Sequence, residues 1–107
     1  MITYEDFQKL EIKIGRIKSA EKAAGTDKLL KLIFDIGDAE RQIMSAIAEF
    51  FPDPSVLVGK EMPILTNLEP RTFRGYESQG MIIATDLNGR PILLRPEEEV
   101  PPGSPVK

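Results

Sequence analysis

Short apolar runs, each bounded by turn-forming residues, dominate this chain and leave little room for long helices. In residues 28–36, four apolar side chains share one face by strand parity: Leu30, Leu32, Phe34 and Ile36. Such a period of two is the pattern of a half-buried strand. Further strands are expected at 10–14, 40–48, 62–68, 80–86 and 91–95. Five or six short strands with regular turn signals predict an all-β fold, and favour a small barrel over a sandwich.

Glycine, proline and small polar residues mark the ends of these strands. Thr3 is expected to cap a short N-terminal helix, because acidic residues fill the turn that follows it. The apolar phase changes from Ile14 to Ile17 across Gly15, which predicts a β-bulge or a sharp bend at that glycine. Two prolines in residues 49–55 exclude a long strand from that segment.

The expected connections are hairpins, one irregular loop and a tail. Gly37-Asp38-Ala39 and Asn88-Gly89 each predict a hairpin between their flanking strands. A turn also explains Asp86-x-Asn88-Gly89 better than a calcium loop does, because the further acidic ligands are missing. Residues 69–79 are expected to form a loop. The acidic and then proline-rich residues 97–105 are expected to be either a loose end or an extended segment packed on a partner.

The chain contains no cysteine, no histidine and no tryptophan. This composition excludes Cys/His zinc sites, histidine-activated nucleophiles and disulfides. Phosphate-binding loops are excluded as well, because Gly59-Lys60 has Pro54 where a glycine is required and no G-x-G-x-x-G occurs. Glutamates 97–99 lie beside prolines and are expected to be solvated rather than catalytic. We therefore expect a protein that is not an enzyme and binds neither a cofactor nor a metal.

Neither a signal peptide nor a membrane span is visible in the sequence. The N-terminus lacks a basic region followed by an apolar one, and no apolar run approaches the roughly 18 residues that a spanning helix needs. We expect a cytoplasmic protein without a membrane partner.

Charge is distributed unevenly along the chain. The net charge is −3, from 14 basic and 17 acidic residues, which by itself argues against a generally basic nucleic-acid-binding protein. Residues 59–95 nevertheless carry five basic and four acidic side chains, a positive balance. Lys28 and Lys31 form a further basic pair, but strand parity places them on different faces, and Lys31 is expected to be solvated.

Two arginines alternate with two aromatic residues within the basic segment: Arg71, Phe73, Arg74 and Tyr76. Such a set can neutralise phosphates and stack on bases, which favours RNA binding. The alternative is a turn-rich loop in which Phe73 covers one end of the barrel and the arginines pair with Glu69 and Glu77.

The order and spacing of motifs along nearly the whole chain resemble those of one family. The segments that carry the resemblance are Gly15–Ile17, Asp27–Leu32, Asp35–Gly37, Arg41–Ala48, Leu57–Lys60, Asn67–Arg71, Ser78–Met81 and Val100–Ser104. They are similar to the tRNA-binding domain appended to methionyl-tRNA synthetases. The same domain occurs as a free-standing tRNA-binding protein, in an aminoacylation cofactor that is the precursor of a cytokine, and in a related secretion chaperone.

The resemblance implies a fold, a dimer and a binding face. The fold is an oligonucleotide/oligosaccharide-binding (OB) fold, a five-stranded Greek-key barrel with a short N-terminal helix, formed by residues 1–107 as a single tRNA-binding domain. The homodimer is built through the C-terminal segment, with an interface at Val100, Pro101, Pro102 and Val106. The RNA-binding face consists of Lys28, Asn67, Arg71, Arg74, Ser78 and Met81. Filling of the core is the alternative role for Met81.

The sequence departs from the family pattern at three places. Ala24-Gly25-Thr26 stands where the family often has His-Pro, and Ser45-Ala46-Ile47 stands where it has Ser-Gly-Ile. Glu69 replaces the usual lysine of Asn-Leu-Lys-Pro, which removes one positive charge and adds a negative one beside the expected site. We expect either a lower RNA affinity or reliance on the synthetase body for most of it.

The expected function is that of a non-catalytic, structure-specific tRNA-binding domain. It dimerises and raises the tRNA affinity of methionyl-tRNA synthetase, whose catalytic region belongs to the same chain or to a separate one. The alternative on the same dimeric barrel is a free-standing tRNA-binding protein or a secretion chaperone that binds peptides in apolar pockets. A purely structural dimerisation module is the third possibility.

Overall fold

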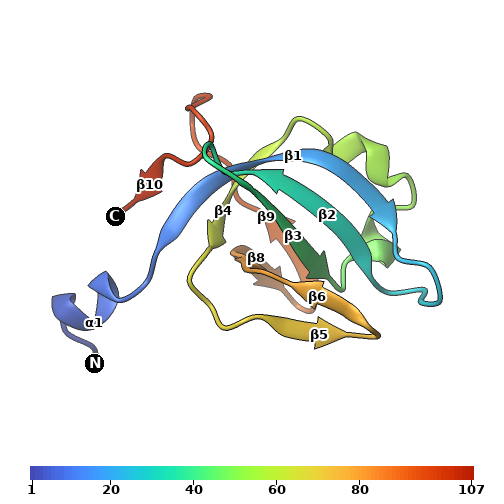
Figure 1. The fold of residues 1–107 in the computed structure, drawn as a ribbon, viewed down its shortest axis with the longest axis horizontal. Helices are drawn as coiled ribbons and strands as arrows, with labels where there is room; N and C mark the ends of the chain where they lie inside the picture. The colour runs from blue at the N-terminus through green and yellow to red at the C-terminus, as the bar shows by residue number, and fades with distance from the viewer.

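A barrel of short antiparallel strands forms the body of the molecule, as Figure 1 shows. This computed structural model describes all residues 1–107. The main sheet has the order β3-β2-β1-β4-β7. These strands are β1 (Ile12–Lys22), β2 (Leu30–Asp35), β3 (Glu40–Ser45), β4 (Glu61–Leu65) and β7 (Met81–Ile82). Because β7 returns beside β3, the sheet nearly closes, and the predicted all-β barrel is confirmed.

The remaining elements are short and surround this barrel. They are the helix α1 (Tyr4–Gln8), the 3-10 helices η1 (Ala48–Phe50) and η2 (Pro54–Leu57), the hairpin of β5 (Arg71–Phe73) and β6 (Tyr76–Ser78), the hairpin of β8 (Ala84–Leu87) and β9 (Arg90–Leu93), and β10 (Pro105–Val106). None of the helices has the length and apolar character that crossing a membrane requires.

The inward row of β2 organises the interior. Leu30, Leu32 and Phe34 have no exposed surface, and Ile36 is also buried, as the sequence predicted. They pack in one cluster with side chains from the surrounding elements, among them Ile17, Ile43, Leu57, Met62 and Ile64. Each such side chain contributes about 1.5–3 kcal/mol when it is fully buried. The barrel therefore has a continuous apolar filling.

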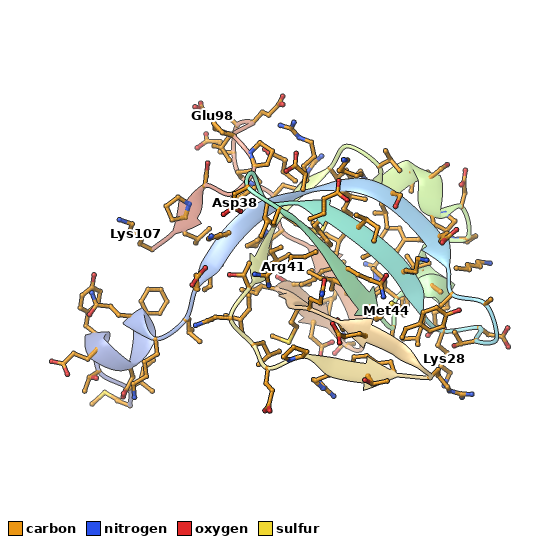
Figure 2. The ribbon with its side chains drawn as sticks, viewed as in Figure 1. Lys28, Asp38, Arg41, Met44, Glu98 and Lys107 are labelled. Atoms are coloured by element: carbon orange, nitrogen blue, oxygen red, sulfur yellow. The ribbon has the colours of Figure 1, made fainter.

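Arg41 closes the remaining gap in the barrel by hydrogen bonds to backbone. Its guanidinium donates to the carbonyl oxygens of Thr66 (2.8 Å) and Gln79 (3.1 Å). The Gln79 N–H donates in turn to the Gln42 carbonyl at 2.7 Å. Figure 2 shows Arg41, which lies near the start of β3. A half-buried cation thus joins β3 to the segments that follow β4 and β6.

The prediction of a β-bulge at Gly15 is wrong. The register between β1 and β2 shifts instead between Ile17 and Ser19. A Cβ at position 15 would lie 2.7 Å from Cδ1 of Phe34 and 3.0 Å from Cδ1 of Ile64. Glycine is required there because the Phe34 ring packs directly on the backbone of β1. The Phe34 ring of the neighbouring strand therefore occupies the space that a side chain at position 15 would fill.

The prediction of an irregular loop at residues 69–79 is also wrong. Residues 71–78 form the β5–β6 hairpin, whose two-residue turn has positive φ at Arg74 (52°) and Gly75 (86°). The predicted turn at Asn88-Gly89 has nearly the same angles, 52° and 86°. Both are the primed turns that match the twist of a hairpin. The first was missed because neither of its strands shows a run of apolar residues.

The C-terminal tail is not a loose end, because it pairs with β1 of its own chain. The Gly103 N–H donates to the Ile14 carbonyl at 2.7 Å, and the Ile14 N–H donates to the Ser104 carbonyl at 2.8 Å. β10 continues this pairing, with Val106 opposite Ile12. The tail therefore extends the sheet along the edge of β1 that β2 leaves free.

A charged network fastens the beginning of the tail. The buried carboxylate of Glu61 accepts from the Val100 N–H at 2.9 Å and from the Arg16 guanidinium at 3.3 Å. Arg16 also pairs with Glu99 at 2.7 Å. Charge-assisted hydrogen bonds of this kind are among the stronger ones in proteins. Tail residues 99–106 thus belong to the barrel.

Helix α1 stands away from the barrel, at the left in Figure 1, and has no buried residue. Its predicted cap is confirmed: Thr3 Oγ1 accepts from the Asp6 N–H at 3.1 Å, and the Asp6 carboxylate accepts from the Thr3 N–H at 3.2 Å. The Thr3 N–H, followed by the Lys9 ammonium, lowers the pKa of the Asp6 carboxyl below its usual value. The cap closes the first turn of this helix, whose Tyr4 side chain is 70% exposed.

Gly15→Ala tests the close packing of β1 against Phe34. The added methyl group forces the ring or the strand to move, so we expect the free energy of unfolding to fall by about 1–3 kcal/mol. Ser19→Ala, on an exposed position of the same strand, is the control and should change it by less than about 0.5 kcal/mol. Urea denaturation measures both. Equal stability of the Gly15 variant and the wild type would contradict the packing argument.

Candidate functional site

The β5–β6 hairpin is fixed at one end of the barrel by its aromatic side chains. Phe73 and Tyr76 pack against a small second cluster formed by Ala23, Leu29 and Met44. The Tyr76 hydroxyl donates to the Ala24 carbonyl at 3.0 Å. The hairpin is therefore joined to the loop between β1 and β2. Phe73 thus covers one end of the barrel, as the turn-rich alternative proposed. Tyr76 is a second anchor, which the sequence analysis did not identify.

This anchoring brings two of the predicted cations together. Lys28 and Arg74 border one hollow of about 420 Å³, which the segment Gly25–Asp27 completes. Figure 2 shows Lys28 at the end of the barrel near the tip of the hairpin. Positive φ at Arg74 places this residue in the turn itself. No apolar side chain lines the hollow, and its charged side chains are Lys28, Arg74 and Asp27. Two cations against one carboxylate leave a positive balance, so the hollow suits a solvated anion better than an apolar group.

Arg71 lies on the same hairpin and stacks on its neighbour. Its guanidinium carbon lies 4.8 Å from the centre of the Phe73 ring, which is within the range of a cation–π interaction. Neither Arg71 nor Arg74 has an acidic partner within 4.0 Å. The alternative in which both pair with Glu69 and Glu77 is therefore wrong, and both charges are available to a ligand.

Ser78 and Asn67 are engaged within the protein. The Ser78 hydroxyl, 3% exposed, accepts from the Met44 N–H at 3.0 Å and donates to the Gly80 carbonyl at 3.0 Å. The Asn67 side chain accepts from the Glu11 N–H at 2.8 Å and donates to the Lys9 carbonyl at 2.7 Å. Burial and these bonds give Ser78 a structural role, and the RNA contact expected of it stays a prediction. Asn67 is exposed, but it holds the chain between α1 and β1.

Met81 lies outside the hollow that Lys28 and Arg74 border. It lies on β7 opposite Leu65 of β4, and 43% of its surface is exposed. The alternative that Met81 fills the core is therefore wrong.

The absence of ion pairs is a property of the whole basic segment. None of the five basic side chains in residues 59–95 has an acidic partner within 4.0 Å, whereas five of the eight in residues 1–58 do. Lys31 is among the paired ones, 3.3 Å from Glu21. Three of these unpaired cations were not identified in the sequence analysis: Lys60, Arg90 and Arg95. The positive charge balance of residues 59–95 was the signal that could have identified them.

Ser78→Ala tests the structural role of this hydroxyl. It leaves the Met44 N–H without its acceptor in a buried place, so we expect a loss of about 1–3 kcal/mol in the free energy of unfolding. Thr72→Ala, exposed on β5, is the matched control and should be nearly neutral. Thermal denaturation and RNA titration are measured on both. A Ser78 variant that is fully stable but binds RNA less tightly would show that the hydroxyl contacts RNA directly.

Comparison with known proteins relates this geometry to a family. Residues 12–105 match the family model described as "Putative tRNA binding domain". Methionine–tRNA ligase of Archaeoglobus fulgidus is 53% identical over 105 residues, which are 98% of this chain and 16% of the ligase. The chain thus spans about a sixth of the length of the curated relatives that it matches.

Two solved structures have the same fold as this chain over its entire length. The MetRS related protein from Pyrococcus horikoshii is 42% identical, with a TM-score of 0.93 over 100% of this chain and 98% of that one. Chaperone CsaA from Bacillus anthracis is 25% identical, with a TM-score of 0.90 over 100% and 99% of the two chains. Sequence and fold therefore agree that this chain belongs to the tRNA-binding domain family and is related to a region of methionine–tRNA ligases.

Proposed function

We propose that this chain is a non-catalytic domain that binds folded tRNA, dimerises, and thereby raises the affinity of methionyl-tRNA synthetase for tRNA. One observation carries the proposal. The β5–β6 hairpin holds Arg71 and Arg74 free of acidic partners and places Arg74 beside Lys28 at one end of the barrel.

The chemistry of this face suits the RNA backbone. Arg71, Arg74 and Lys28 are exposed cations, and cations of this kind bind phosphates with a strong dependence on salt concentration. The hollow between Lys28 and Arg74 has no apolar lining that would hold a base. Contacts to phosphates position a protein on RNA without reading its sequence. The proposed recognition is therefore of the shape of the tRNA.

Dimerisation is supported by apolar surface at the opposite end of the molecule. Tyr4 of helix α1, Leu10 after this helix and Val106 of β10 line one groove of about 330 Å³, the α1–β10 groove. Their exposed fractions are 70%, 45% and 38%. A second copy of the chain, related by a two-fold axis, would cover the same surface on both partners. Of the predicted interface residues, Pro101 and Val106 are exposed, whereas Val100 and Pro102 are half-buried against the barrel of their own chain.

A dimer would combine two weak RNA faces into one tighter site. Binding of the second face becomes intramolecular once the first is bound, which raises the overall affinity without new contacts. This compensates for Glu69, the acidic residue beside the hairpin. The relatives are about six times longer than this chain. We therefore place the catalytic region of the synthetase outside these residues, either in the same chain or in a separate one. We place the protein in the cytoplasm, together with its tRNA partner.

Binding of unfolded peptides is a second candidate function. It is favoured by the likeness to a protein described as a chaperone, which extends over the whole of both chains. Peptide binding by apolar contact would persist at high salt, whereas tRNA binding should weaken steeply.

Replacing both hairpin arginines tests the RNA face. Arg71→Ala with Arg74→Ala removes two phosphate contacts from each protomer, so we expect at least a tenfold loss of tRNA affinity at about 0.1 M salt and a salt slope reduced by about 1–2 per protomer. Filter binding at several salt concentrations measures both quantities.

The matched control is Lys18→Ala with Lys31→Ala. These two lysines already pair with Glu40 and Glu21, so their loss should change tRNA affinity much less. A same-length unstructured RNA serves as the second control and should bind more weakly than tRNA. If the arginine variant keeps both the affinity and the salt slope of the wild type, the face is misassigned.

Val106→Asp tests the proposed dimer interface. A carboxylate in the apolar groove would have to be buried in the dimer, so we expect monomers in sedimentation velocity at micromolar concentration and a weaker tRNA complex. Val58→Asp is the matched control, because Val58 is 49% exposed and lies after η2, outside the groove. A Val106 variant that remains dimeric, or a monomeric wild type, would refute the interface.

A further inference from the structure

A second hollow, of about 470 Å³, lies between η1 and the strand β9 and shares no residue with the Lys28–Arg74 face or the α1–β10 groove. Phe50, Phe51 and Leu93 contribute to its apolar lining. All three are partly buried and pack against the main core cluster. Their positions are therefore set by the barrel, and the hollow is a preformed apolar surface.

Three basic side chains complete the lining of this η1–β9 hollow: Lys60, Arg90 and Arg95. None of them forms an ion pair, and no acidic residue lines the hollow. Lys60 and Arg95 also border a neighbouring hollow that contains Glu61 and glutamates 97–99. Arg90 does not, so Arg90 is the cation that belongs to the η1–β9 hollow alone. The chain as a whole has a net charge of −3. Three cations without ion-pair partners around an apolar surface therefore favour the binding of an anionic ligand with an apolar part.

We infer that the η1–β9 hollow holds an unpaired nucleotide of the bound RNA. Its base lies against the phenylalanine rings, and its phosphates lie on Arg90, Lys60 and Arg95. This inference rests on the proposed tRNA-binding function and extends it to a second, single-stranded contact. A volume of about 470 Å³ is within the usual range of small-ligand sites. Stacking of a base on an aromatic ring is tolerant of sequence, so the contact is compatible with recognition by shape.

Charge favours a nucleotide over the end of a peptide. A terminal carboxylate supplies one negative charge, whereas successive phosphates of an RNA strand supply several along a line. The hollow combines three cations with two phenylalanines, which is the combination that single-strand binding sites use. An apolar peptide with a free carboxylate is therefore the competing ligand that the experiment has to exclude.

The direct test is a titration of the ¹⁵N-labelled full chain with hexauridylate, followed by NMR. We expect the amides of residues 50–51 and 90–95 to shift. Arg90→Glu should weaken hexauridylate binding by about tenfold through lost and repelled phosphate contact. Phe51→Leu should weaken it by about fivefold at unchanged charge through the lost ring. Melting curves of both variants verify that they are folded.

Lys18→Glu is the matched control, because it changes the net charge by the same amount as Arg90→Glu and Lys18 lines none of the three hollows. Equal weakening by both reversals would mean a long-range charge effect and would overturn the inference. Absence of shifts at residues 50–51 and 90–95 would overturn it as well. So would an apolar carboxylate-terminated peptide that shifts these amides when hexauridylate does not.

The two proposals fail separately. If tRNA binding depends on Arg71 and Arg74 but not on Arg90 or Phe51, the tRNA-binding function stands and the η1–β9 hollow is not a nucleotide site. If hexauridylate shifts the hollow while the double arginine variant binds tRNA like the wild type, the nucleotide site stands and the hairpin face is wrong.

Discussion

Contact between the Phe34 ring and the backbone of β1 at Gly15 sets the geometry on which the rest of the structure depends. The ring lies in the centre of the barrel, and any side chain at position 15 would meet it. This close approach allows β1 to pair with β2 along one half and with β4 along the other. The edge of β1 that remains free is taken by the tail. One strand thus defines the barrel and the positions of both termini.

The candidate RNA face follows from this closure. β6 lies beside β3, where the Met44 N–H donates to Ser78 at 3.0 Å. The β5–β6 hairpin is consequently carried to the loop that contains Lys28, and Phe73 and Tyr76 seal the contact. Arg71 and Arg74 are left on this anchored hairpin without an ion-pair partner within 4.0 Å. Preorganised cations lose little conformational freedom on binding, which partly offsets the low overall charge of the chain.

The surfaces proposed for RNA and for the partner copy lie at opposite ends of the molecule. Figure 2 shows Lys28 at one end and Lys107 at the other, and the longest dimension is 40 Å. A dimer formed through α1 and β10 would leave both RNA faces open and far apart. Such an arrangement suits a large folded ligand that spans both protomers, since avidity requires that both sites engage at once.

The sequence by itself determined the local structure: the inward row of β2, the hairpin turns at Gly37 and Asn88, the cap at Thr3, and the absence of histidine and cysteine chemistry. These features depend on residues that are neighbours along the chain. The resemblance to the tRNA-binding family came from the order of motifs. Only the tertiary structure decided why residue 15 is glycine, that the tail pairs with β1, that Ser78 is buried, and which cations lack partners. The first three depend on contacts between residues far apart in the sequence, and the fourth depends on where each charged side chain lies in space. A single sequence carries no local pattern for either.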